Sequence, residues 1–217
     1  MALNINGTTG ISGVDGSVSA PAVTGTDSNT GITFPAADTI KFATGGVERM
    51  AITNSGVTGI TAGITMADQW RLSTNFTQGN NVREVIDQNW ERADTDSYGA
   101  IGSPMTESSG IFTFPETGIY LIFFQSAATN TGSAAVFNSY IDVTTDNSSY
   151  SDASISINRV VAASTFVNPT ILFIFDVTDT STHKVKFSVY SSGNNGVIYG
   201  NTGRTQTGAT FLKIGDT

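Results

Sequence analysis

Hydrophobic residues are densest between Gly110 and Gln125, where the chain runs GIFTFPETGIYLIFFQ. Pro115 and Gly118 break this stretch into two predicted strands. Residues 119–124 are apolar at every position, and successive residues of a strand point to opposite faces, so this strand is expected to be buried on both sides. One face can pack on the domain's own core. Since the pattern predicts no long helix, we expect a neighbouring subunit to cover the other face.

A second stretch, residues 170–177 (TILFIFDV), is also apolar on both faces. Residues 184–190 alternate instead, with Val185, Phe187 and Val189 on one face, which is typical of an antiparallel strand with one wet face. The chain is therefore predicted to be all-β. Shorter alternating stretches cover residues 135–143, 154–162, 196–199 and 210–214.

The N-terminal part of the chain predicts a hairpin of its own. Ile40 and Phe42 share one face of its first strand, and Met50 and Ile52 share one face of its second. The Gly45-Gly46 pair supplies the turn, because glycine adopts positive φ at little cost. A lone hairpin with a single apolar face is marginal in water. Three copies around an axis would bury that face.

These patterns divide the chain into three parts. Residues 1–62 are expected to form an N-terminal anchor and β shaft, residues 63–67 a linker, and residues 68–217 a head. Within the first part, residues 1–31 are rich in Gly, Ser, Thr and Asn. Such a segment cannot bury enough apolar surface to offset its own ordering entropy. We expect another subunit or a larger assembly to hold it.

The composition narrows the range of partners. The net charge is −8, and the ten Lys and Arg residues are scattered without a basic cluster, which argues against binding to nucleic acid. The chain has no cysteine, so it contains neither a disulfide nor a thiolate metal site. Charged residues make up only 13% of the sequence and Gly is abundant, which suits short strands and tight turns.

The first residues, MALNINGTTGISG, lack both the basic and the apolar region of a signal peptide. No apolar run approaches the roughly 20 residues needed to span a bilayer, so we expect no membrane insertion. A protein that is made in a cytoplasm without an export signal, yet works outside cells, is most simply released by lysis. This combination points towards a virus and a place on the virion surface.

The pattern Gly-Ile-Phe-Thr-x-Pro-x-x-Gly-Ile-Tyr resembles the central motif of C1q/TNF-like jelly-roll domains, which form compact trimers. Residues 183–189 and 208–212 resemble the penultimate and last strands of the same family. The resemblance covers roughly the last two thirds of the chain and implies a trimeric jelly-roll head. The family motif is carried by Gly110, Phe112, Pro115, Gly118 and Tyr120, with Ile111, Thr113 and Ile119 between them.

In the C1q/TNF family, the two doubly apolar segments correspond to strands of the inner sheet around the threefold axis. The resemblance therefore implies a trimer contact through these segments. The reversed parity, which would put Leu121 and Phe123 at the axis, remains open. The residues expected at the contact are Tyr120, Ile122, Phe124, Leu172 and Ile174.

Candidates for chemistry are few. His183 is the only histidine, and we expect it to be solvated or to cap a turn. No nucleophile-elbow motif accompanies it, so a Ser-His-Asp triad has no support. Some C1q-like trimers bind calcium through loop carboxylates, which makes Asp142, Asp146 and Asp152 metal candidates by resemblance. Solvated loop charges explain these residues more simply. We expect no catalytic residue and no cofactor.

Residues 31–40 and 45–50 resemble shaft modules in tail-fibre proteins of marine bacteriophages. Together with the head, they favour a bacteriophage virion protein that forms a short homotrimeric fibre and binds the host surface, through a glycan or another receptor. An alternative is a capsid decoration or head-fibre protein that docks on other virion proteins through its N-terminal segment. A third hypothesis is a polysaccharide depolymerase, which would need a carboxylate pair that no motif indicates.

Overall fold

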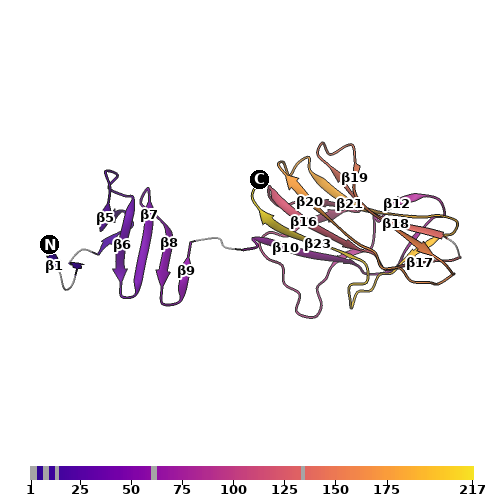
Figure 1. The fold of residues 1–217 in the computed structure, drawn as a ribbon, viewed down its shortest axis with the longest axis horizontal. Coiled ribbons are helices and arrows are strands. Elements are labelled where there is room, and N and C mark those ends of the chain that lie inside the picture. Colours follow the sequence, from indigo (N-terminus) through magenta and orange to yellow (C-terminus); the bar gives the residue numbers. More distant parts are fainter. Residues whose placement is uncertain (1–3, 7–9, 13–14, 60–62, 133–134) are drawn as a thin grey trace. The chain divides into compact units, whose positions relative to one another are not determined.

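Every regular element in the described residues is a β-strand (Figure 1). The computed structural model describes residues 4–6, 10–12, 15–59, 63–132 and 135–217. The chain forms two compact units, Met1–Ala62 and Gly63–Thr217. Within the described ranges, no helix has the length and hydropathy that a membrane span requires. The all-β class predicted from the sequence is confirmed.

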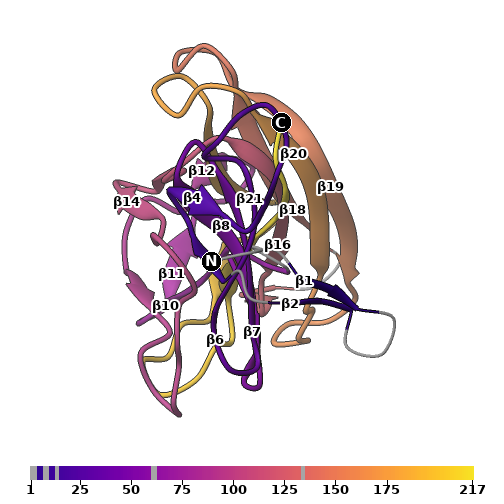
Figure 2. The ribbon, with the colours of Figure 1, turned by 90° about the vertical axis from the view of Figure 1, so that its left-hand side faces the viewer.

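The unit Met1–Ala62 is built around an antiparallel sheet with the strand order β5-β6-β7-β8-β9. Two short hairpins precede this sheet in the chain, β1 with β2 (Figure 2) and β3 with β4. The predicted hairpin is present as β7 and β8. Its turn contains Gly45 and Gly46, both with positive φ. The strands are β1 Asn4–Asn6, β2 Gly10–Ser12, β3 Gly16–Ser17, β4 Ala20–Pro21, β5 Val23–Thr24, β6 Gly31–Ala36, β7 Thr39–Thr44, β8 Val47–Thr53 and β9 Gly56–Thr58.

One face of this sheet buries small side chains beside Lys41, which pairs with Thr33 and Ala51. Thr33, Ala43 and Ala51 are buried there. The hydroxyl of Thr33 and the N–H of Phe34 both donate to the Asp15 carbonyl at 2.7 Å, which ties the preceding segment to β6. These bonds satisfy backbone groups that a lone hairpin would leave to water.

The opposite face of the sheet is apolar and open, and we call it the β7 face. Cross-strand partners lie on the same face of an antiparallel sheet, so the register assembles the β7 face as two rows. Its exposed members include Ile40 at 37%, Ile52 at 38% and Val57 at 55%. The first row is Val23, Ile32, Phe42 and Met50, and the second is Ile40, Ile52 and Val57.

The unit Gly63–Thr217 contains two principal sheets. The first, which we call the β16 sheet, has the order β13-β10-β23-β16-β20. Its strands are β10 Met66–Leu72, β13 Trp90–Arg92, β16 Gly118–Gln125, β20 Thr170–Val177 and β23 Gly208–Gly215. The second, the β21 sheet, has the order β14-β15-β21-β18-β19, and β12 also pairs with β21. Its strands are β12 Arg83–Val85, β14 Thr106–Ser108, β15 Ile111–Thr113, β18 Ala135–Thr144, β19 Ser151–Val160 and β21 Lys184–Ser191. A small sheet of β11 Phe76–Gln78, β22 Gly196–Ile198 and β17 Ala128–Asn130 completes the unit.

Aromatic rings fill the space between the two principal sheets. Phe112 has its ring centroid 5.5 Å from Trp70 and 5.1 Å from Trp90, both edge-on. Phe187 of the β21 sheet stacks on Phe124 of the β16 sheet at 4.5 Å. Aromatic pairs in these geometries contribute beyond the area that they bury. The core therefore joins the two sheets through rings rather than through aliphatic side chains alone.

The motif around Gly110 marks the point where the chain passes from one sheet to the other. Gly110 has a φ of 79°, and a Cβ there would lie 2.5 Å from the Ile86 carbonyl oxygen, so only glycine fits without strain. After β15 the chain crosses to β16, which begins at Gly118. The Tyr120 hydroxyl donates to the Glu116 carbonyl at 2.9 Å and closes this corner. The predicted break into two strands is confirmed.

The beginning of the second unit differs from the expected linker. Residues 63–67 were expected to connect the parts, with the head starting at Asp68. In the structure β10 already begins at Met66, whose side chain is fully buried in the core of the head. Met66 is the first residue of the buried and partly exposed alternation of β10. Because most of the residues before it are small or polar, the sequence alone does not show that the strand begins there.

Candidate functional site

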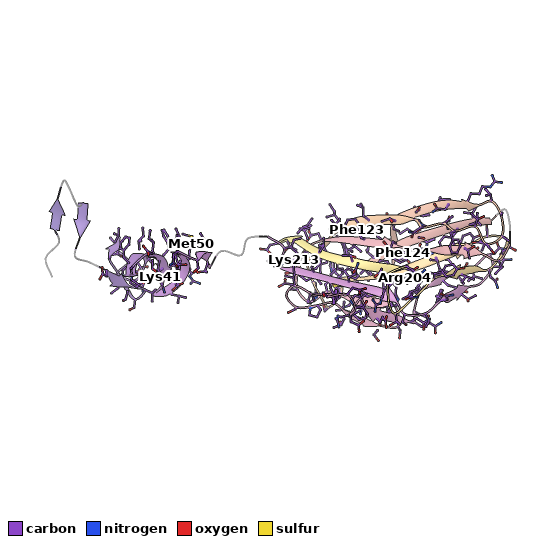
Figure 3. All side chains as sticks on the ribbon, turned by 90° about the horizontal axis from the view of Figure 1, so that it is seen from below. Lys41, Met50, Phe123, Phe124, Arg204 and Lys213 are labelled. Atoms are coloured by element: carbon purple, nitrogen blue, oxygen red, sulfur yellow. The ribbon has the colours of Figure 1, made fainter. Side chains whose placement is uncertain are left out.

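The candidate site is the face of the β16 sheet that points away from the core. Along β16 the side chains alternate between buried and partly exposed positions from Gly118 to Gln125. Ile119, Leu121 and Phe123 occupy the partly exposed positions. Phe123 and Phe124, labelled in Figure 3, are neighbours in sequence and belong to opposite faces. The strand thus supplies apolar side chains to the core and to an open surface at once.

The strand register joins these positions into a continuous apolar row. Ile174 of β20 pairs with Leu121, Leu121 pairs with Leu212 of β23, and Leu212 pairs with Ala67 of β10. Ile174 remains 55% exposed. Directly paired side chains in a sheet are within contact distance. We call this surface, with the neighbouring pair of Leu172 and Phe123, the β16 face.

The β16 face is apolar at one end and polar at the other. Leu172, 53% exposed, pairs with Phe123, and the same row continues through Thr210 to Gln69. A shallow hollow at this end is lined by Gln69, Phe123, Gln125, Thr170, Thr205, Gly208 and Thr210. An open apolar surface bordered by polar residues is the composition of a protein–protein contact rather than of a polar ligand site.

A charged side chain closes the polar end of the sheet. Arg71 of β10 lies on the same face of the sheet as Gln69, but its side chain is only 2% exposed. Its Nε lies 2.8 Å from Glu91 Oε1 and its Nη2 lies 2.9 Å from Asp94 Oδ1. The segment after β13 therefore covers this end, while the row through Ile174 and Leu121 stays open.

Of the five residues expected at the trimer contact, three lie elsewhere. Tyr120, Ile122 and Phe124 have no exposed surface and face the core of the same chain, so the parity expected for β16 is wrong. The Tyr120 ring, for example, has its centroid 4.6 Å from that of Phe114. Leu172 and Ile174 do lie on the outer face. The reversed parity, with Leu121 and Phe123 outward, is the one that the structure has.

A polar signal in the sequence indicates the correct parity. Gln125 shares the parity of Leu121 and Phe123, and in β20 Thr170 and Asp176 share that of Leu172 and Ile174. Polar residues at the ends of a doubly apolar strand mark the face that reaches solvent, because burying them costs free energy.

Burial also perturbs Tyr120 at the end of the sheet. Removal of the phenol from water, assisted by the negative charge of Glu116, raises the pKa of Tyr120 to about 12. Lys213 lies nearby with its Nζ 3.3 Å from Glu116 Oε1 and 2.9 Å from Asp216 Oδ1. The hydrogen bond to Asp216 raises the pKa of Lys213. Both groups stabilise the corner where β16 begins.

The three metal candidates are not brought together. Asp142 and Asp152 are cross-strand partners on β18 and β19, and both contact the Arg83 guanidinium. Asp146 lies in the turn between these strands and accepts hydrogen bonds at 2.8 Å from the N–H groups of Ser148 and Ser149. These bonds hold the pKa of Asp146 well below its usual range. Among the described residues, no group of three or more His, Cys, Asp or Glu is placed to hold a metal ion.

His183 was expected to be solvated or to cap a turn, and the structure places it in the turn before β21 with its side chain buried rather than solvated. Its side chain is 8% exposed and its ring centroid lies 5.5 Å from that of Phe175. Nε2 lies 3.3 Å from the Thr178 hydroxyl, and Nδ1 lies 3.1 Å from the Thr182 hydroxyl. The ring is therefore a packed part of the turn before β21, with both nitrogens occupied.

Comparisons with known proteins bear on the fold. No protein-family model matches the chain, and no curated protein matches its sequence. Among solved structures, the Eiger TNF of S. frugiperda superposes with a TM-score of 0.53 at 9% identity, covering 71% of this chain and 96% of that one. Murine APRIL at pH 5.0 gives a TM-score of 0.50 at 10% identity, covering 69% and 98%.

The head is a C1q/TNF-like jelly roll. This confirms the fold that the motif around Gly110 and Tyr120 implied. The PRD1 vertex protein P5 superposes with a lower TM-score of 0.43, at 17% identity over 70% of this chain and 99% of that one. The β16 face is thus one outer surface of a jelly-roll head.

Proposed function

We propose that this protein is a bacteriophage virion protein that forms a short homotrimeric fibre, with residues 1–62 as anchor and shaft and a jelly-roll head that binds the host surface. The observation that carries the proposal is the β16 face. Its row of Ile174, Leu121 and Leu212 stays open to water in a single chain. A contiguous apolar surface of this kind is the mark of an interaction site.

A second copy of the chain is the simplest cover for the β16 face. The face carries no charged residue in its two rows, so it offers no electrostatic selection for a different partner. Closed symmetric assemblies of identical chains are the commonest way to bury such surfaces. Three copies are the number that the C1q/TNF resemblance implies.

The N-terminal unit supports the same assembly independently. Its β7 face leaves Ile40, Ile52 and Val57 exposed, whereas Thr33, Ala43 and Ala51 on the opposite face of that sheet are buried. Each unit by itself therefore has an exposed apolar sheet face. A homo-oligomer supplies the cover for both units with a single kind of partner.

Three heads on one fibre also suit attachment. Binding sites that are weak one at a time gain strength when they engage a surface together, because the later contacts form at high effective concentration. The proposal thus assigns the protein a role in binding and architecture rather than in catalysis.

Two measurements test this proposal. Light scattering of the full chain should give three times the 22.7 kDa of one chain, and a monomer at micromolar concentration would overturn the assembly. Gold-labelled antibody against the head should mark fibre ends on intact virions. Label over the capsid would replace the tail-fibre role with that of a decoration protein docked through the N-terminal segment. Virions without label would refute the viral role altogether.

A further inference from the structure

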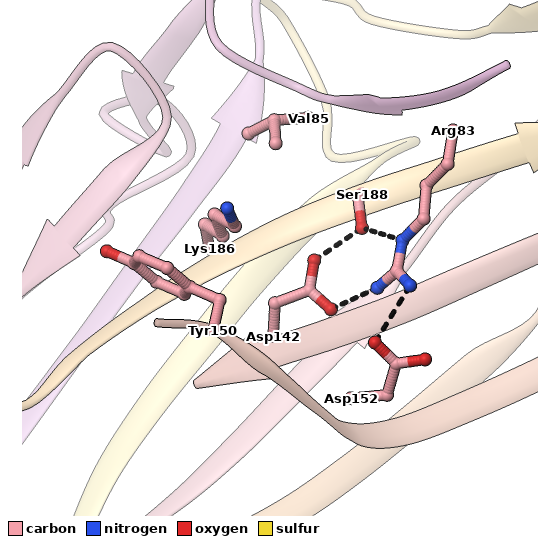
Figure 4. A pocket seen from close by; sticks show the side chains of 7 residues that line it. All are labelled: Arg83, Val85, Asp142, Tyr150, Asp152, Lys186 and Ser188. Atoms are coloured by element: carbon pink, nitrogen blue, oxygen red, sulfur yellow. Dashed lines mark hydrogen bonds and ion pairs between the residues drawn. The ribbon is translucent and has the colours of Figure 1, made fainter. Parts of the chain in front are cut away.

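A polar hollow lies on the outer face of the β21 sheet (Figure 4). Its lining side chains come from four strands and from the segment before β19, and its volume is about 250 Å³. Lys186 and Ser188 of β21 have the parity opposite to the core residues Val185 and Phe187, so they point outward. The hollow is therefore on the far side of the core from the β16 face. Assembly through the β16 face leaves it accessible.

One side of the hollow is a fixed network of charges. Arg83 of β12 donates through Nη2 to Asp142 and through Nε to the Ser188 hydroxyl at 3.0 Å, and its Nη1 forms an ion pair with Asp152 Oδ1 at 2.8 Å. The Ser188 hydroxyl donates in turn to Asp142, which is 3% exposed. The guanidinium also lies 3.7 Å from the centroid of the Tyr140 ring. Arg83 is thus held from three directions, and the carboxylates around it are preorganised.

The other side combines a cation with apolar surface. The Lys186 ammonium lies 3.9 Å from the centroid of the Tyr150 ring. Among the described residues, Lys186 forms no ion pair, so its three N–H donors are left for a ligand or water. Val85 lines the hollow across from Tyr150 in the close view (Figure 4). The hollow thus presents donors, carboxylate acceptors and apolar walls within one small space.

The balance of these charges selects the kind of ligand. Arg83 and Lys186 are offset by Asp142 and Asp152, so the lining has no net charge. An anion would meet two carboxylates, and a cation would meet a guanidinium and an ammonium. A neutral hydroxyl avoids both conflicts, because it can donate to a carboxylate and accept from an ammonium at the same time. Such hydrogen bonds to charged groups are stronger than neutral ones.

The size of the hollow limits the ligand further. A volume of about 250 Å³ lies below the roughly 300–1,000 Å³ of pockets for drug-sized ligands, which favours a single small ring. The C–H groups of such a ring can pack on Val85 and on the Tyr150 ring. We propose that this hollow binds one neutral sugar residue of a glycan. The assignment rests on the proposed attachment function and adds to it a location and a ligand class.

Saturation-transfer NMR on the full-length protein tests the assignment. The probes are the methyl glycosides of glucose, galactose, mannose, fucose and N-acetylglucosamine, with N-acetylneuraminic acid as a charged comparison. We expect signal from at least one neutral sugar. Lys186→Met keeps the aliphatic stem and removes the ammonium, and Asp152→Asn keeps the shape and removes the negative charge. Each should weaken binding at least about tenfold, because each removes a hydrogen bond to a charged group.

Arg159→Met is the matched control, since Arg159 is an exposed cation on β19 with a different cross-strand partner, Val136. It should leave sugar binding unchanged, and thermal melting should show that all three variants fold. The assignment is overturned if the wild type binds no neutral sugar, if it binds only the charged sugar, or if Lys186→Met and Asp152→Asn bind as the wild type does. Adsorption of the wild-type trimer to host cells separates the two proposals. If both variants still adsorb to host cells, the hollow is not the attachment site, but the attachment function stands. If the wild-type trimer never adsorbs, the attachment function itself is wrong.

Discussion

Replacing Leu172 and Ile174 together by Asp should dissociate the assembly without unfolding the chain. The two side chains are 53% and 55% exposed in a single chain. Burying a whole Leu or Ile side chain contributes about 1.5–3 kcal/mol, so the exposed half of each contributes about 1 kcal/mol on assembly. Six such side chains in a trimer amount to about 6 kcal/mol, or about four orders of magnitude in an equilibrium constant. Each buried carboxylate without a partner adds a further cost of several kcal/mol.

Sedimentation velocity over a range of protein concentrations measures this effect. The double variant should sediment as one 22.7 kDa chain at concentrations where the wild type is trimeric, with an unchanged circular dichroism spectrum. The control is Ile157→Asp, which places one carboxylate per chain on β19 at a side chain that is 68% exposed, and which should remain trimeric. The assignment of the β16 face is refuted if the double variant associates within about tenfold of the wild-type constant, since that difference is only about 1.4 kcal/mol.

Three further predictions address other parts of the structure. Because the folded-state pKa of Tyr120 is raised to about 12 from an ordinary value near 10, its stabilising effect is complete below pH 10 and is lost as the pH rises towards 12. Urea unfolding at rising pH should therefore show a loss of about 2–3 kcal/mol that Tyr120→Phe removes, and equal pH profiles would contradict this. Gly110→Ala should destabilise the head by about 1–3 kcal/mol in urea, since its φ is positive and a Cβ would meet backbone. Gly99→Ala, with open space around its Cβ, is the control, and an equal loss there would count against the argument. In this cysteine-free chain, Ile52→Cys on the β7 face should be linked between copies by a short bismaleimide, whereas the turn variant Ser55→Cys should not. If the two variants are linked equally well, the β7 face is not a contact between copies.

Local patterns were sufficient to predict much of the fold. The break between β15 and β16 follows from Pro115 and Gly118, and the hairpin of β7 and β8 follows from alternation around two glycines. These features depend on residues that are neighbours in the sequence. The apolar residues of β16 do not determine its parity, because they occupy both faces, and only the polar residues Gln125, Thr170 and Asp176 near the strand ends distinguish the outer face.

The hollow around Arg83 could not be foreseen for a different reason. Arg83 and Asp142 are 59 residues apart in the sequence, and they meet only because β12 and β18 both pair with β21. Nothing in the local pattern of either residue indicates the other. The same holds for His183, whose contact with Phe175 depends on where the turn after β20 folds back. Sites built from several strands require the register of the whole sheet.

The apolar row through Ala67, Leu121, Ile174 and Leu212 has a consequence for how the protein matures. Its members come from four strands that are widely separated along the chain, and β23 must insert between β10 and β16 before the row is continuous. Such non-local pairings form late and slowly. A head that is only partly folded therefore lacks the continuous β16 face that a sister chain would cover. Under the proposed assembly, only chains whose heads have folded completely can join a trimer through the β16 face.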